Sequence, residues 1–279
     1  MIIIADSGST KTDWCITDGN TATQVTTAGL NPYFNTDEQI ADTVCDALKP
    51  FASQPVEAVY FYGAGCAFGE PCDRIRQSIT RVVDAPVEVC SDLLGAARSA
   101  CGYEPGIVSI LGTGSSSAQY DGERIVRNVP SLGYILGDEG SGAVLGRLWI
   151  GDCLKNQVPA ALSNEFIERY RLTLPELYDR IYKQPYPNRY LASFVPFLSE
   201  HKDEPAVHRL VLNAFKSFWV RNVLQYEPGL PVHFIGSVAY HFADVLHEAA
   251  SALSVSIASV EQSPMPGLIR YHAISSTRQ

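Results

Sequence analysis

Hydrophobic and polar positions along the first hundred residues follow two different periods. Short apolar runs such as Ile2–Ala5 predict buried strands, whereas the segment behind Thr36 carries apolar residues at helical spacing. Thr36 is a suitable N-cap, and Asp37 and Glu38 belong in the first turn of the helix that it begins. The pattern predicts strands at 2–5, 12–18, 22–28, 56–62 and 87–90, and helices at 37–50, 71–83 and 93–100, in the order βββαβαβα.

The same order of elements begins again near Gly102–Gly106, where the boundary between two lobes is expected. The repeat is one of topology, because the halves share little sequence beyond their Gly-Ser/Thr turns. We predict strands at 106–111, 116–120 and 123–127, a helix from about 139, a mostly helical stretch at 159–226 broken at 184–187, a strand at 232–235, a helix at 239–251, a strand at 255–258 and a helix at 266–275.

The predicted fold is therefore α/β with two lobes, residues 1–104 and 105–279. The second lobe carries a helical insertion at about 159–227, and the last helix could return to the first lobe.

Composition narrows the classes of partner. The chain has 279 residues and a formal net charge of −9, with no run of Lys or Arg, so neither nucleic acid nor an anionic membrane is an expected partner. No apolar stretch reaches the ~18–20 residues that a membrane span requires. The seven cysteines are odd in number and include no CxxC pair, and no secretory leader is visible, so a cytoplasmic location is expected.

Four glycine-rich turns carry the candidate chemistry: Asp6–Thr12, Leu111–Ser115, Gly137–Gly142 and Gly236–Val238. The first two follow apolar runs and precede a second extended segment, as in a β-hairpin. Glycine permits positive φ, which lets the backbone N–H groups of such a turn converge on an anion. Each turn taken alone could be an ordinary polar turn, but two hairpins about a hundred residues apart predict a duplicated phosphate clamp.

The ordered motifs DxGxTKT, SD, LGTGS, GDEGSG and GS[VA] resemble those of the N-acetylglucosamine kinase group. That group lies in the BadF/BadG/BcrA/BcrD ATPase family of the actin-like ATPase and sugar-kinase superfamily. The resemblance extends from residue 3 to about residue 272. It implies two ribonuclease H-like lobes that close on ATP and a sugar, each lobe built as βββαβαβα.

The resemblance also implies a site for ATP and Mg²⁺. Asp6 would reach Mg²⁺ through water, because a carboxylate at the end of a buried strand needs a cation or hydrogen-bond donors. Lys11 would add positive charge, and Ser237 and Val238 would pack on the adenosine. The residues assigned to ATP and Mg²⁺ are Asp6, Ser7, Gly8, Ser9, Thr10, Lys11, Thr12, Gly112, Thr113, Gly114, Ser115, Gly236 and Ser237. Ser7 and Ser9 stand where many members of the family have glycine.

Asp92 is the candidate catalytic residue. In the kinases that the chain resembles, this aspartate is the general base that takes the proton from the attacking sugar hydroxyl. Its position between a strand and a helix also suits a simple helix N-cap, and both roles remain open.

The resemblance also implies a sugar pocket, and the residues assigned to it are Asn31, Gly65, Asp92, Gly133, Tyr134 and Asp138. The Asn31 amide can donate and accept at once, although an Asn-Pro pair is also a common turn initiator. Asp138 would accept from two sugar hydroxyls. The role of Glu139 stays open, because a glutamate in a first helical turn is often only electrostatically favourable there.

The implied activity is phosphorylation of N-acetyl-D-glucosamine to its 6-phosphate, with N-acetylmuramic acid and glucosamine as alternative substrates. A homodimer formed through the helical second lobe is the family expectation. Two other classes of protein are alternatives. An ATPase activator of a 2-hydroxyacyl-CoA dehydratase would need cluster-type cysteine spacing, which is missing. A sugar-sensing regulator would usually add a DNA-binding segment. The histidines show no metal-ligand spacing, and Cys66 and Cys72 are expected to be core thiols.

Overall fold

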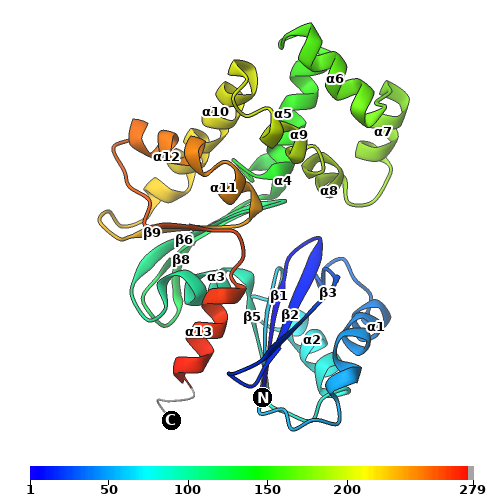
Figure 1. Ribbon diagram of the computed structural model, residues 1–279, viewed down its shortest axis with the longest axis vertical. Helices are drawn as coiled ribbons and strands as arrows, with labels where there is room; N and C mark the ends of the chain where they lie inside the picture. The colour runs from blue at the N-terminus through cyan, green and yellow to red at the C-terminus, as the bar shows by residue number, and fades with distance from the viewer. Residues whose placement is uncertain (276–279) are drawn as a thin grey trace. The chain divides into compact units, whose positions relative to one another are not determined.

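The computed structural model describes residues 1–275, and the chain divides into two compact units. Unit 1 comprises Met1–Pro105, Tyr120–Ile125 and the described residues from Ser263 onward. Unit 2 comprises Gly106–Gln119 and Val126–Gln262. Each unit contains one five-stranded sheet (Figure 1).

The sheet of unit 1 has the strand order β3-β2-β1-β4-β5. Its first three strands are antiparallel neighbours, whereas β1, β4 and β5 run parallel. The elements are β1 Ile2–Ser7, β2 Lys11–Thr17, β3 Ala22–Ala28, α1 Asp37–Leu48, a 3₁₀ turn at Lys49–Phe51, β4 Ala58–Gly63, α2 Glu70–Thr80, β5 Val87–Ser91, α3 Asp92–Cys101 and α13 Met265–Ser275.

Parallel pairing places the carboxyl ends of β1, β4 and β5 at one edge of this sheet. Ser7 is in register with Gly63, and Gly63 is in register with Ser91. Loops that leave the carboxyl ends of parallel strands are the usual location of sites in α/β sheets. The residues that follow β4 and β5 therefore lie close to Asp6 at the end of β1.

Local sequence explains the helices of unit 1. Thr36 and Gln39 form a capping box at the start of α1, in which each side chain bonds the backbone N–H of the other residue. Helix α1 buries a stripe of residues at helical spacing, Ile40, Val44, Ala47 and Leu48. Helix α13 packs beside α3 and β1, so a segment from the end of the chain completes unit 1 (Figure 1).

The sheet of unit 2 has the strand order β10-β9-β6-β7-β8, with β6, β9 and β10 parallel. The elements are β6 Gly106–Leu111, β7 Ser115–Tyr120, β8 Ile125–Val129, α4 Gly133–Leu136, α5 Gly142–Leu154, α6 Ala160–Tyr170, α7 Leu174–Tyr182, α8 Pro187–Ala192, α9 Val195–Glu200, α10 Pro205–Arg221, a 3₁₀ turn at Val223–Gln225, β9 Val232–Ile235, α11 Ser237–His241, α12 Ala243–Ala252 and β10 Ser259–Glu261.

Aromatic side chains pack the helices of unit 2 together. Trp149 on α5, Phe166 on α6 and Phe197 on α9 are fully buried, with ring centroids 5.1–6.0 Å apart. Burying an aromatic side chain and packing it edge to face each contribute to stability, the second by about 0.5–1.5 kcal/mol per pair. This cluster fixes α9, which borders the cavity described below.

The predicted α/β fold class is confirmed: unit 1 begins with the order βββαβαβα, and unit 2 follows the order βββαβαβ, whose closing helix α13 packs in unit 1. Three predicted elements differ. The helix expected from 139 begins at Gly142, since Asp138 and Gly140 adopt left-handed backbone angles and Ser141 provides the cap. The helix expected at 239–251 is interrupted at Phe242, whose backbone is not helical.

The strand predicted at 255–258 is wrong. Pairing with β9 begins at Ser259, and only the Ala258 N–H reaches β9, where it donates to the Val232 carbonyl at 2.7 Å. None of the described helices combines the length and apolar character that a membrane span needs.

Candidate active site

Backbone hydrogen bonds hold the turn that follows β1, one of them within the turn and one from Gly29, the residue after β3. The Gly8 N–H donates to the Lys11 carbonyl at 3.0 Å, and the Gly29 N–H donates to the Thr10 carbonyl at 3.1 Å. A Cβ on Gly29 would overlap the Gly8 carbonyl oxygen, so only glycine permits this approach. Gly8 and Ser9 are partly buried and Thr10 and Lys11 are exposed at the surface of the turn.

Ser7 and Thr12 have a different position from the other residues of this motif. Both are fully buried, and their hydroxyl oxygens lie 2.7 Å apart. The Ser7 hydroxyl donates to the Leu30 carbonyl at 3.0 Å, and the Leu30 N–H donates back to Ser7 Oγ at 3.0 Å. These two hydroxyls therefore tie the turn to the segment that leads into Asn31.

Asp6 lies among carboxylates. Burial raises its pKa to about 7, and the charges of Asp92 and Asp13 act in the same direction, whereas Lys11 lowers it. Lys11 Nζ lies 2.5 Å from Asp13 Oδ2, so the positive charge of Lys11 pairs with Asp13 and also acts on Asp6. The sequence motifs did not single out Asp13. The alternation of β2 could have indicated it, because Lys11 and Asp13 are two positions apart and share a face.

Asp92 is not the cap of its helix. Ser91 is the N-cap of α3, and its Oγ accepts the Leu94 N–H at 3.2 Å. The simple capping role considered for Asp92 is therefore wrong. Asp92 is the first helical residue, its Oδ1 accepts the Leu93 N–H at 2.9 Å, and burial raises the pKa of its carboxyl. The backbone N–H groups of Leu93 and of Asp92 itself partly oppose this rise in pKa.

Asn31 and Gly65 are brought together. A Cβ on Gly65 would lie 2.8 Å from Asn31 Oδ1 and 2.9 Å from the ring of Tyr33. Asn31 Oδ1 accepts the Tyr33 N–H at 3.0 Å, which is the geometry of an Asx turn. Asn31 thus performs the turn-initiating role, and its side-chain NH₂ group is the part that a ligand could use. The loop of Gly65 is fixed to β1, because the Ala64 N–H donates to the Ser7 carbonyl at 2.9 Å.

In unit 2, the Gly112–Ser115 turn is closed by the start of α5. The Gly112 N–H donates to the Gly114 carbonyl at 3.0 Å. The Gly142 N–H donates to the Gly112 carbonyl at 2.8 Å, and the Ala143 N–H donates to the Thr113 carbonyl at 3.0 Å. The first amides of α5 therefore hold the turn in place.

The Asp138 carboxylate lies directly against this turn. Its Oδ1 accepts the Ser115 N–H at 3.2 Å, and a Cβ on Gly114 would lie 3.1 Å from Oδ2. Burial raises the pKa of Asp138 to about 6, the Ser115 N–H opposes the rise, and the Glu139 charge adds to it. The structure thus joins a predicted sugar ligand to the predicted second phosphate clamp.

Glu139 points to a different set of partners. Arg221 Nε lies 2.8 Å from Glu139 Oε1, and Asn222 Nδ2 donates to Oε2 at 3.3 Å. Gly133 and Tyr134 lie in the short helix α4, where Gly133 is exposed and Tyr134 packs partly against the core of unit 2.

The turn at Gly236 completes a cavity in unit 2. Gly236 has φ 122°, and a Cβ there would overlap the Leu111 carbonyl oxygen, so this turn lies against the Gly112 turn. The cavity has a volume of about 400 Å³. It is lined by Gly112, Thr113, Gly142, Ala192, Val195, Pro196, Ser199, Glu200, Ser237, Val238 and His241.

Gly112, Thr113 and Ser237 were predicted from motifs, whereas the residues of α8 and α9 were missed. No local pattern marks them, because they reach the cavity only through the packing of the helices.

Within residues 1–275, no group of three or more His, Cys, Asp or Glu side chains could hold a metal ion. Magnesium does not require such a cage, since it commonly binds one or two carboxylates together with substrate phosphates and water. Asp6, whose pKa is raised partly by two neighbouring carboxylates, fits that kind of donor set.

No protein-family model and no curated protein matches the chain. Among solved structures, a candidate N-acetylglucosamine kinase from Porphyromonas gingivalis is 47% identical, covers 99% of this chain and 100% of its own, and superposes with a TM-score of 0.94.

Two further structures share the fold at low identity. A candidate N-acetylglucosamine kinase from Chromobacterium violaceum is 17% identical over 97% of this chain and 98% of its own, with a TM-score of 0.63. A ROK family glucokinase from Streptomyces griseus, solved with glucose and AMPPNP, is 15% identical over 98% of both chains, with a TM-score of 0.56. The full-length identity of 47% shows that the chain belongs to the N-acetylglucosamine kinase-type family of the actin-like ATPase and sugar-kinase superfamily.

Proposed function

We propose that the protein transfers the γ-phosphate of ATP to an amino sugar, converting N-acetyl-D-glucosamine to N-acetyl-D-glucosamine 6-phosphate. The observation that carries the proposal is the placement of Asp92 beside the Asp6 turn, at the edge of the sheet where β1, β4 and β5 end. Ser91 caps α3, so Asp92 is not needed for that role.

Asp92 acts as the general base. The Leu93 N–H holds Oδ1, so Oδ2 is the oxygen that would accept the proton of the sugar 6-hydroxyl. A raised pKa strengthens the base, because a carboxylate with a higher pKa holds a proton more readily. The hydroxyl oxygen then bonds to the γ-phosphorus, the bond from that phosphorus to the bridging oxygen breaks, and ADP leaves. Transfer depends mainly on alignment and charge neutralisation.

The nucleotide would occupy the cavity of about 400 Å³ in unit 2, with its phosphates on the Gly112–Ser115 turn. Val195 and Val238 supply apolar surface for the adenine, and the exposed Ser237 supplies a hydroxyl. In unit 1, Ser9, Thr10 and Lys11 would supply a second set of phosphate donors. Mg²⁺, when bound, would neutralise phosphate charge, and Asp6 would hold it through water.

In unit 1, the sugar would bind to Asn31, Gly65 and Asp92. Gly65 allows Asn31 and Tyr33 to pack directly against its backbone, and this contact positions the Asn31 amide for the sugar. Asp138 supplies carboxylate oxygens for sugar hydroxyls, which are donors that a buried carboxylate requires.

The test is an ADP-release assay with Mg²⁺ and ATP. The sugars are N-acetylglucosamine, N-acetylmuramic acid, N-acetylmannosamine, glucosamine and glucose, and Asp92→Asn is the matched control. We expect strong stimulation by N-acetylglucosamine that the control loses. Stimulation by N-acetylmuramic acid or glucosamine, and not by N-acetylglucosamine, would identify that sugar as the substrate in its place. Hydrolysis that no sugar changes would overturn the kinase proposal in favour of an ATPase activator.

A further inference from the structure

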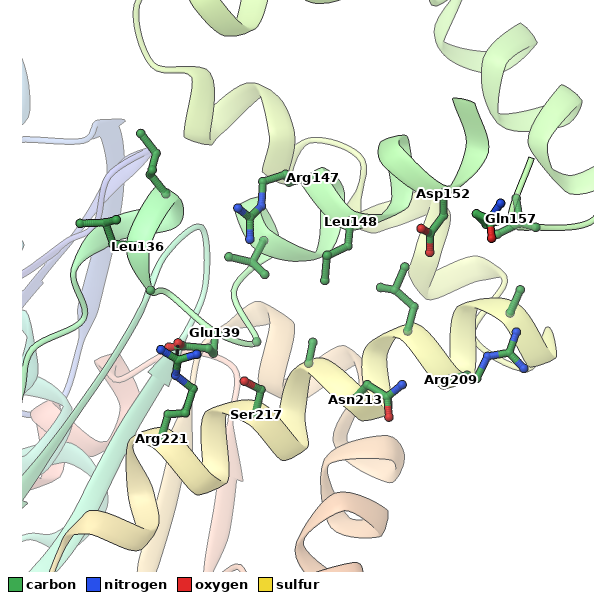
Figure 2. A pocket seen from close by; sticks show the side chains of 18 residues that line it. Leu136, Glu139, Arg147, Leu148, Asp152, Gln157, Arg209, Asn213, Ser217 and Arg221 are labelled. Carbon is green, nitrogen blue, oxygen red and sulfur yellow. Dashed lines mark ion pairs between the residues drawn. The ribbon is translucent and has the colours of Figure 1, made fainter. Parts of the chain in front are cut away.

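A second cavity lies in unit 2, between α5 and α10 (Figure 2). Its volume is about 540 Å³, and it shares no lining residue with the cavity proposed for the nucleotide. Its apolar surface comes from side chains at helical spacing on the two helices, Val144, Leu148, Leu210 and Ala214. A concave site of this size with a few polar groups on an apolar floor is typical of small-molecule binding.

Positive charge on the cavity wall is only partly compensated. Figure 2 shows Glu139 and Arg221 paired near one end, at 2.8 Å, and Asp152 near Arg209 at the other. Arg147 and Arg209 form no ion pair or hydrogen bond with the described residues, and Asp152 is the remaining carboxylate among the lining residues. The cavity therefore keeps an excess positive charge in a chain whose formal net charge is −9.

We propose that this cavity binds a small organic anion that carries a carboxylate or phosphate group on an apolar body. Arginine guanidinium groups recognise both anions through paired N–H donors, and the charge-assisted hydrogen bonds that form are stronger than neutral ones. Arg209 of α10 offers such donors at the end of the cavity near Asp152, and Arg147 of α5 offers them at a separate place on the wall, so either one could hold the anionic group (Figure 2). The floor around Leu148 and Leu210 receives the apolar body, and Asn213 and Ser217 add polar contacts.

The cavity also borders the loop that carries Asp138. Gly137, Glu139 and Gly140 line it on either side of Asp138 in sequence, while the Asp138 carboxylate lies against the Gly112–Ser115 turn. A Cβ on Gly140 would lie 3.2 Å from the ring of Phe215 on α10, so this loop is packed tightly against a cavity wall. A bound anion therefore acts on the geometry of Asp138; this regulatory step rests on the proposed function.

Binding is tested by calorimetry on the full chain, with phenyl phosphate and benzoate as probes and benzamide as the neutral analogue of benzoate. Inorganic phosphate tests whether the anion alone suffices. We expect phenyl phosphate or benzoate to bind at saturating ADP, since the two cavities are separate. Arg147→Gln combined with Arg209→Gln should weaken binding about tenfold or more, because each removes a charged donor. Arg81→Gln, which replaces an exposed arginine of unit 1, should leave the affinity for the probe unchanged.

Leu148→Glu supplies a second variant, because it places a negative charge on the floor of the cavity and should also weaken binding. Unchanged circular dichroism checks that each variant is folded. Equal binding of benzamide and benzoate, displacement by ADP, or unaltered affinity in the arginine variants would each overturn the proposal.

The regulatory step is read from kinetics, as a change in the KM for the sugar that the anion produces in the parent chain and not in the double variant. A constant KM at saturating anion would contradict it. Because binding is measured without turnover, loss of the kinase proposal and loss of this site are separate outcomes.

Discussion

Asp6 and Asp92 are proposed site residues, and their local environment changes the pKa of both carboxyl groups. Both are carboxylates at the carboxyl edge of the unit 1 sheet, and burial raises the pKa of each. The charge of Asp92 contributes to the raised pKa of Asp6, so the two groups oppose each other's ionisation. Such an arrangement costs stability in the empty protein and favours a bound cation or a transferred proton.

Asp6→Asn should therefore stabilise the protein at neutral and higher pH. The folded-state pKa is about 7 and the ordinary value is 3.8, so the folded chain binds more protons across this range. Stability then falls as pH rises from about 4 to about 7, and the amide removes that loss. Thermal unfolding at pH 8 should show a melting temperature raised by about 2–4 °C, following roughly 1 kcal/mol. Asp46→Asn, at an exposed position, is the control. No gain at pH 8 relative to pH 5 would refute it.

Asp92→Asn and Ser91→Ala should separate chemistry from stability at adjacent positions. Losing the base should lower kcat by about 10²–10⁴-fold with little change in sugar or ATP binding. Losing the cap should reduce the free energy of unfolding by about 1 kcal/mol and leave kcat nearly unchanged. Steady-state kinetics and urea unfolding measure the two effects. Near-normal kcat in a folded Asp92→Asn protein would refute the assignment of the base.

At the scale of elements, α13 is attached to the helix that Asp92 begins. His272 Nε2 lies 2.8 Å from the Tyr62 hydroxyl, and Arg98 of α3 donates to Tyr62 at 2.8 Å and to Glu88 at 2.7 Å. The Ser99 hydroxyl of α3 donates to the Pro264 carbonyl at 2.8 Å. Tyr62 lies in β4, just before the loop of Gly65, so α13 supports two elements that carry proposed site residues.

Acid should weaken this attachment through His272. Burial lowers the pKa of His272 to about 4, the Arg98 charge lowers it further, and Glu88 partly opposes this. Between about pH 6.5 and pH 4 the unfolded chain binds the proton and the folded chain does not, so stability is lost as pH falls. Urea unfolding at pH 7 and pH 5 should show a loss of about 1–2 kcal/mol that His272→Gln reduces. His247→Gln, at an exposed position, should show the same loss of stability between pH 7 and pH 5 as the parent chain. An unchanged loss in His272→Gln would contradict this origin.

The elements differ in how far the sequence predicts them. The strand at Ile2–Ser7 and the cap at Thr36 follow from local apolar runs and capping chemistry. The interruption at Phe242 and the late start of β10 could not be predicted, because they depend on pairing and packing with distant segments.

At the candidate site, the motifs predict the turns but not which side chains face a ligand. Ser7 and Thr12 belong to the motif and are buried, whereas Val195 and Pro196 belong to no motif and line the nucleotide cavity.

At the scale of the whole molecule, oligomeric state and location stay predictions. We expect a homodimer formed through the helices of unit 2, where Leu174, Tyr178 and Tyr182 leave an exposed apolar stripe along α7. Unpaired apolar patches of this kind often mark protein interfaces. Light scattering should give a dimer, and Tyr178→Glu should shift the mass toward the monomer, with Tyr240→Glu on α11 as the control. A monomer in the parent chain would refute the prediction.

Unit 1 is assembled from separate stretches of chain, and this affects how the protein is made. Its sheet buries Ile4, Cys15 and Tyr62 against Met265 and Leu268 of α13, which are synthesised after all of unit 2. Until α13 is synthesised, the apolar face that contains Ile4, Cys15 and Tyr62 therefore stays uncovered. By then every residue of unit 2 is already available to fold. Nascent chains halted before residue 268 would expose that face to chaperones and proteases, so quality control can distinguish chains that contain α13 from chains interrupted before it.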